Sequence, residues 1–265
     1  RGSRVRHSGA AIDLGDDGCN LLPQGLVQLI GKAELIGLLT QAEHFLRQLQ
    51  TALAARERGQ EVYLETCPQY LLLNENKYQL SGFESAKYVC SPPLRAYEDS
   101  AALWGALAGG VIDTVATDHC SFDFRGAKQL GKDDFSAIPN GMPGVETRPA
   151  LMLTFGTQHG LPPELLCRVM AEQPAKLFGL YPRKGIVAEG ADADLVVWDP
   201  AWRGVISAAA QTQNVDYTPF EGFAVSGRAE TVLVNGEIAV KDGHLTNASL
   251  GEYVPRTPCQ RYRRV

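Results

Sequence analysis

The stretch EDSAALWGALAGGVIDTVATDHC, residues 98–120, decides the fold class of this chain. Acidic residues open a run of good helix formers, and Gly109 and Gly110 end that run. The next residues, 111–115, are mostly apolar, as expected of a strand that is buried on both faces of a parallel sheet. A helix followed by such a strand predicts an α/β unit.

The same alternation continues on both sides of this stretch. Helices are predicted over 49–59, closed by Gly59, and over 147–160 and 162–180, and strands over 61–67 and 86–93, the second stopped by two prolines. We therefore expect residues 50–182 to form a parallel α/β unit, either an open sheet or a barrel.

The character of the chain changes near residue 183. Short β runs then follow one another, punctuated by glycines. Asn235-Gly236 lies between the apolar runs 232–234 and 237–240, which is a strong signal for a β-hairpin. Residues 183–265 are predicted to be a small all-β module with a C-terminal tail.

The first 49 residues fit neither pattern. Residues 1–20 have no sustained period of two or of 3.6, whereas residues 24–50 are rich in leucine and place an apolar stripe at helical spacing. This second part is either an amphipathic helix or an accidental reading frame, and the pattern does not decide between them.

Composition excludes several classes of function. The 265 residues carry a net charge of −5, so no basic field favours nucleic acid or anionic lipid. No apolar run is long enough for a membrane span, and no signal peptide opens the chain. Six scattered cysteines without a CxxC pair favour a reducing cytoplasm over a disulfide framework.

Candidate reactive groups follow the predicted strands, at residues 65–70, 90–95 and 116–120, because catalytic groups gather at the carboxyl ends of parallel strands. Asp118 could bind a cation and accept a proton from bound water. The alternative is that Asp118 caps the next segment and His119 packs beside it. Cys120 has no base placed for it, so we expect a buried thiol. The irregular loop 121–144 is long enough to be functional or disordered.

The histidines provide no zinc signature. Of the five, no two are spaced as HxH or HxxxH. His44 and His244 are expected at the surface.

Longer strings carry a family resemblance. In order they are VYLETCPQYLLLNE (62–75), YVCSPPLR (88–95), IDTVATDHCSFDF (112–124), DFSAIPNGMPGVETR (134–148), PAKLFGLYPRKGIVAEGADADLVVWDP (174–200) and NVDYTPFEGF (214–223). From about residue 50 to about residue 240 the chain resembles the hydantoinase/dihydropyrimidinase family of the amidohydrolase superfamily, and is most similar to the bacterial D-phenylhydantoinase type.

The resemblance implies a fold and a chemistry. The fold is an incomplete TIM-like barrel, of which residues 50–182 are the C-terminal part, with strands of a small β-sandwich in residues 183–265. The family opens cyclic amides, hydantoins or dihydropyrimidines, with water activated by two divalent metals, zinc in the intact enzymes. Asp118 would bind one metal and carry the proton to the leaving nitrogen. Ser91 and Asn140 would hold the ring through main-chain hydrogen bonds, and His119 would support the metal ligand. A homo-oligomer, commonly a tetramer, is also implied.

The departures from the family are equally informative. Its HxH pair, its carboxylated lysine and its two further histidines are absent, and residues 37–48 replace a strand that carries the last histidine. We therefore expect that this chain alone does not bind two metals or hydrolyse hydantoins, and that it is unstable or associates. A frameshift or fragment junction near residue 49 explains the abrupt switch. A non-catalytic scaffold and a half-enzyme completed by a partner are the alternatives.

Overall fold

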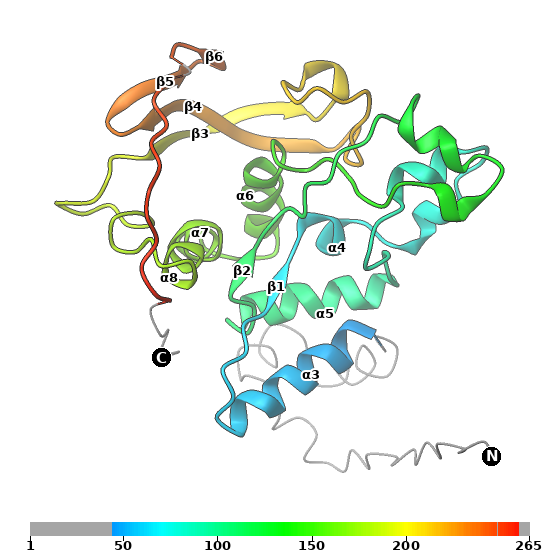
Figure 1. Ribbon diagram of the computed structural model, residues 1–265, viewed down its shortest axis with the longest axis horizontal. Helices are drawn as coiled ribbons and strands as arrows, with labels where there is room; N and C mark the ends of the chain where they lie inside the picture. The colour runs from blue at the N-terminus through cyan, green and yellow to red at the C-terminus, as the bar shows by residue number, and fades with distance from the viewer. Residues whose placement is uncertain (1–43, 248, 260–265) are drawn as a thin grey trace.

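The computed structural model of the chain describes residues 44–247 and 249–259. Figure 1 shows two helices, α3 and α5, lying side by side at one end and a four-stranded antiparallel sheet at the other. A short pair of parallel strands lies between them. The α/β fold class is confirmed.

The parallel unit is built from α3 (His44–Glu57), β1 (Glu65–Thr66), α4 (Pro68–Leu72), α5 (Tyr97–Ala108) and β2 (Thr114–Val115). Strands β1 and β2 pair in parallel, with Glu65 opposite Thr114 and Thr66 opposite Val115. Residues 111–115 are buried throughout, as predicted, but the regular strands are shorter than the predicted runs. The helix predicted before Gly59 is confirmed, and this glycine has a φ of 78°.

An ion pair joins α3 to the strands. The guanidinium of Arg56 donates to the Asp113 carboxylate at 2.6 Å and to the main-chain oxygens of Val62 and Val111. Asp113 also accepts the Leu64 N–H at 2.7 Å, so one buried carboxylate serves a helix and both strands. At the other end of α3, the Phe45 N–H donates to Asp99 of α5 at 2.8 Å.

The strand predicted over 86–93 is wrong. The chain instead forms two 3-10 helices, η2 (Glu75–Gln79) and η3 (Glu84–Tyr88), followed by an irregular segment. The Val89 carbonyl accepts the Gly141 N–H at 3.0 Å from a distant loop. The main chain of Val89 thus bonds to that loop, and among the residues that the structure describes this segment pairs with no strand.

Two short 3-10 helices, η4 (Ala127–Gly131) and η5 (Phe135–Ala137), interrupt the long loop after β2. The Asp216 carboxylate accepts the N–H groups of Phe124 at 2.6 Å and Arg125 at 2.9 Å. Glu146 likewise accepts the N–H groups of Thr212 and Gln213. The segment before β4 therefore contacts this loop near its start and just beyond its end.

Both helices predicted downstream are present. They are α6 (Arg148–Gln158) and a continuous helical run of α7 (Pro163–Cys167), the π-helical turn η6 (Arg168–Glu172) and α8 (Gln173–Leu177). Leu151 and Met152 of α6 and Leu166 of α7 are fully buried in the main core, together with Leu107 of α5.

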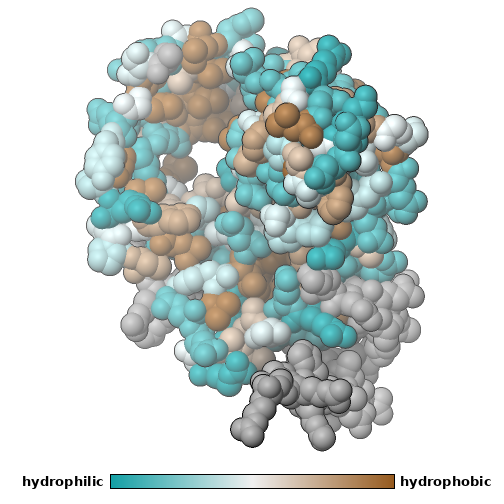
Figure 2. Space-filling model, turned by 45° about the vertical axis from the view of Figure 1, so that its right-hand side comes forward, coloured by the Kyte–Doolittle hydropathy of each residue, from teal (hydrophilic) through white to brown (hydrophobic). Residues whose placement is uncertain are grey.

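The all-β module is an antiparallel sheet in the order β3-β4-β5-β6. Its strands are β3 (Leu195–Val205), β4 (Ala224–Val234), β5 (Glu237–Lys241) and β6 (His244–Leu245), with the 3-10 turn η7 (Ala208–Ala210) after β3. The hairpin predicted at Asn235-Gly236 is confirmed, and both residues have positive φ angles, 51° and 83°. Valines 196, 197 and 205 are exposed on β3, and Figure 2 shows apolar surface in the upper part of the molecule, where the sheet lies.

The predicted segment boundaries at residues 49 and 183 stay predictions. Helix α3 runs across residue 49 without a break, and regular β structure begins at Leu195. The expectations for residues 1–43 and for the His44 side chain lie outside the described residues, whereas His244 is exposed as predicted. Within the described ranges, no helix has the length and hydrophobicity to cross a membrane.

Candidate active site at the carboxyl end of the parallel strands

Asp118 stands at the end of the buried run that contains β2. Its side chain is exposed and its φ is 49°, in the left-handed region that few residues other than glycine, asparagine and aspartate adopt. The chain beyond it pairs again, because His119 bridges to Met142 and the Cys120 N–H donates to the Met142 carbonyl at 3.2 Å. Asp118 is thus held between two anchored segments in a strained conformation, which is common at functional sites.

His119 fastens the strand end to the long loop. Its Nδ1 accepts the N–H groups of Gly144 at 3.1 Å and Val145 at 3.2 Å. A ring nitrogen that accepts hydrogen bonds carries no proton, so the neutral ring has its proton on Nε2. His119 therefore ties the residue after Asp118 to the loop at Gly144 and Val145, and its ring is exposed. Its supporting role behind a metal ligand stays a prediction.

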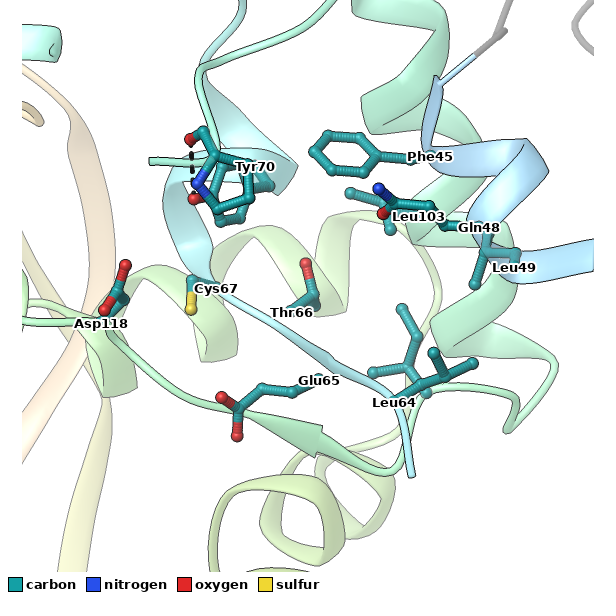
Figure 3. A pocket seen from close by; sticks show the side chains of 12 residues that line it. Phe45, Gln48, Leu49, Leu64, Glu65, Thr66, Cys67, Tyr70, Leu103 and Asp118 are labelled. Atoms are coloured by element: carbon teal, nitrogen blue, oxygen red, sulfur yellow. Dashed lines mark hydrogen bonds between the residues drawn. The ribbon is translucent and has the colours of Figure 1, made fainter. Parts of the chain in front are cut away.

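Asp118 lines a pocket of about 280 Å³ that opens between the strands and α3. Figure 3 shows Asp118, Cys67 and Glu65 on one side of this pocket and Phe45, Leu49 and Leu103 on the other. Glu65 accepts the Thr114 hydroxyl at 2.9 Å, and Tyr70 donates its hydroxyl to the Pro92 carbonyl at 3.0 Å. The pocket therefore combines an exposed carboxylate with an apolar wall, which suits a small ring with polar edges.

Ser91 and Asn140 do not line this pocket. Pro92, the neighbour of Ser91, does. Both predicted residues are exposed, and the hydrogen bond from the Gly141 N–H to Val89 joins the two segments that carry them. The structure thus brings the Ser91 and Asn140 segments together at the strand ends, and their ring-binding role stays a prediction.

The expectation that Cys120 is a buried thiol is wrong. Cys120 is exposed, whereas Cys67 and Cys90 are the buried thiols of this region. The reason lies in the backbone, since the left-handed turn at Asp118 carries the chain out of the core immediately after β2.

Thiol reactivity should separate these cysteines. Burial raises the pKa of Cys67 to about 12 and also raises that of Cys90, so neither forms much thiolate near pH 8. Alkylation by N-ethylmaleimide at pH 8, followed by peptide mass mapping, should modify Cys120 at least ~100-fold faster than Cys67 in the native chain. Equal alkylation rates for Cys67 and Cys120 in the native chain would show that Cys67 is accessible to solvent.

The described residues do not fit a two-metal centre. Over residues 44–247 and 249–259, no group of three histidine, cysteine or acidic side chains is placed to hold a metal ion. Around Asp118, the Cys67 thiol is protonated, Glu65 is bonded to Thr114, and the His119 Nδ1 is used by main-chain N–H groups. What remains is one exposed carboxylate, so no reaction step through a metal follows from these side chains.

Sequence reasoning missed one prominent residue of this region. Lys128 is fully buried within the long loop, and its ammonium donates to three main-chain carbonyls. No sequence signal could have identified it, because its partners are backbone atoms 11 to 39 residues away. The pocket residues Glu65, Cys67 and Tyr70 belong to a strand end that the sequence did single out, without a role.

Enzymes built on α/β folds carry catalytic groups at the carboxyl ends of their parallel strands, which is where the exposed Asp118 lies. Comparison with known proteins narrows this class. The chain belongs to the amidohydrolase family, whose model matches residues 39–239. This match begins before residue 50, where the resemblance was expected to start.

Several relatives carry the name D-hydantoinase. The chain is 48% identical over 207 residues to the D-hydantoinase of Streptomyces coelicolor, covering 78% of this chain and 44% of that protein. It is 45% identical to the D-hydantoinase of Geobacillus stearothermophilus, covering 76% and 43%. Among solved structures, it is similar to D-hydantoinase from Bacillus sp. AR9, with a TM-score of 0.78 at 43% identity over 80% of this chain and 47% of that one. The chain thus spans less than half the length of these relatives.

Proposed function

We propose that this chain is the carboxyl-terminal part of a cyclic amidohydrolase of the hydantoinase/dihydropyrimidinase type. The reaction is hydrolysis of a ring C–N bond in 5-substituted hydantoins or dihydropyrimidines. The observation that carries the proposal is the exposed Asp118 carboxylate, held in a left-handed turn at the end of a buried parallel strand and facing the pocket. The names of the relatives support the substrate class.

We propose that β1 and β2 are neighbouring strands of an incomplete TIM-like barrel and that β3–β6 belong to a small β-sandwich. Their parallel pairing, with α4 and α5 in the connection between them, is what a barrel requires of consecutive strands.

In the proposed reaction, Asp118 transfers a proton from the attacking water to the leaving nitrogen. Its carboxylate takes a proton from the attacking water, whose oxygen forms a bond to the ring carbonyl carbon. The C–N bond then breaks, and the leaving nitrogen receives the proton from Asp118, which returns to its carboxylate form. The main chain at Ser91, whose neighbour Pro92 lines the pocket, and the main chain at Asn140 bind the polar edge of the ring beside Asp118.

The small number of metal-ligating side chains near Asp118 implies that the chain does not act alone. The family generally uses divalent metals, and we propose that the remaining ligands, for two zinc ions, come from outside the described residues. The soluble assembly in the cytoplasm, the homo-oligomer and the cyclic-amide substrate are parts of this same proposal.

The test is a complementation assay. The purified chain is assayed for ring opening of 5-phenylhydantoin and dihydrouracil, alone and mixed with the amino-terminal part of the Streptomyces coelicolor D-hydantoinase in the presence of zinc. We expect turnover only in the mixture. Turnover by the chain alone would overturn the proposal that further metal ligands must come from outside the described residues. A stable mixed complex without turnover would favour the non-catalytic scaffold.

A further inference from the structure

Lys128 is a charged residue inside the loop that follows Asp118. It lies on η4, and its side chain is completely buried. Its Nζ donates to the carbonyls of Val89 at 3.1 Å, Pro139 at 2.6 Å and Gly141 at 2.8 Å. A lysine ammonium has three protons to donate, so these three carbonyls use all of them.

The position of these carbonyls in the chain gives Lys128 its significance. Val89 lies two residues before Ser91, while Pro139 and Gly141 flank Asn140 on either side. The Gly141 N–H donates to Val89 as well, at 3.0 Å. One buried ammonium thus holds together the two segments that carry the proposed ring-binding main-chain groups.

The close approach of these segments depends on Gly141. Its φ is 146°, and a Cβ at this position would lie 2.3 Å from the Cys120 carbonyl oxygen. The loop therefore packs directly against the strand end that carries Asp118, and a shift of either segment would change the whole rim of the site.

We infer that Lys128 is a positioning residue that sets the separation between the main chain at Ser91 and the main chain at Asn140. The inference rests on the proposed function only for the identity of the ring that these groups bind. An apolar side chain of similar length would fill the same space, but the Pro139 and Gly141 carbonyls would lose their lysine donor and Val89 would keep only the Gly141 N–H. With these bonds lost, we expect the two segments to move apart.

The charge state of Lys128 is consistent with this role. Burial lowers its pKa to about 8, because desolvation penalises the ammonium form. The titratable groups that face it are Cys90, from the segment before Ser91, and Cys120, from the strand end, and the Phe122 ring lies 5.9 Å away. Near neutral pH the ammonium therefore keeps its three protons, and above pH 8 the amine has only two to donate.

The experiment compares the full chain with Lys128→Met and Lys128→Arg, and uses Lys132→Met as a matched control. Lys132 is an exposed lysine on the same loop. Hydrogen exchange followed by mass spectrometry reports the protection of peptides that contain Val89 or Gly141, with peptides from β4 as an internal reference. Titration with 5-phenylhydantoin, followed by NMR, reports ring binding.

For Lys128→Met we expect protection at Gly141 to fall by ~10- to 100-fold, the effect of losing hydrogen bonds from a charged donor, and hydantoin affinity to fall with it. Lys128→Arg should restore part of both, and Lys132→Met should change neither. In the unmodified chain, protection at Gly141, corrected for intrinsic exchange, should decrease between pH 7 and 9. In Lys128→Met it should not.

Unchanged protection at both segments in Lys128→Met, while the unmodified chain binds hydantoin, would overturn the role of Lys128 and leave the proposed function intact. If Lys128→Met loses protection but the unmodified chain does not bind hydantoin, the positioning role is supported. Hydantoin is then contradicted as the ligand of these main-chain groups. If Lys128→Met also loses protection in β4, the Arg variant decides, and failure of Lys128→Arg to restore protection at Gly141 while β4 stays protected would overturn the inference.

Discussion

Replacing Asp118 by asparagine is expected to lower the turnover of the complemented enzyme by about 10²- to 10⁴-fold, the contribution of a positioned acid–base group. Asparagine has almost the same shape and also tolerates the left-handed region, so the φ of 49° is retained, whereas the negative charge and the ability to carry a proton are lost. The side chain is exposed, so we expect no change in the free energy of unfolding.

The matched control is Asp242→Asn. Asp242 is also an exposed aspartate with a φ of 50°, but it lies in the turn between β5 and β6, far along the chain from the strand ends. Turnover should be unaffected by this change. The measurement is the rate of 5-phenylhydantoin opening in the mixture with the complementing half. Full activity of Asp118→Asn would show that another group carries the proton.

The second large effect concerns stability. Arg56→Met is expected to reduce the free energy of unfolding by about 3–5 kcal/mol, because it removes one partner of a buried ion pair and leaves the Asp113 charge in the core. The side chains of Arg56 and Asp113 are 11% and 3% exposed, and the guanidinium also bonds to Val62 and Val111. The loss should therefore loosen α3 from both strands.

Urea denaturation at a fixed protein concentration measures this effect. Lys87→Met breaks the ion pair with Glu84, which is 2.6 Å long but half-exposed, and should change the free energy of unfolding by less than ~1 kcal/mol. A double variant, Arg56→Met with Asp113→Leu, should recover part of the loss, since no uncompensated charge remains. Equal effects of Arg56→Met and Lys87→Met would contradict the expectation.

Local sequence predicted most of the helices and the hairpin because their signals lie within a few residues of one another. The acidic opening and glycine ending of α5 and the Asn-Gly turn between β4 and β5 are examples. The strand predicted over 86–93 failed for the opposite reason. A β-strand needs a partner, and the partner of Val89 is a loop about fifty residues further along the chain.

The candidate site divides in the same way. Asp118 could be selected from the sequence, because an acid that follows a buried apolar run stands at a strand end in any parallel α/β unit. The exposure of Cys120 could not, because it depends on the positive φ of the residue two positions earlier.

By itself, then, the amino-acid sequence determined the α/β class, the order of the helices, the hairpin and the position of Asp118 after a buried strand. Those features follow from propensity and periodicity, which are local. The tertiary structure alone decided that the parallel strands β1 and β2 are two residues long, that Arg56 pairs with Asp113, and that Lys128 lies buried among three carbonyls. These features join residues far apart in the sequence. The Lys128 contacts also end on main-chain carbonyls, which nearly every residue type carries and which therefore leave no trace in the order of side chains.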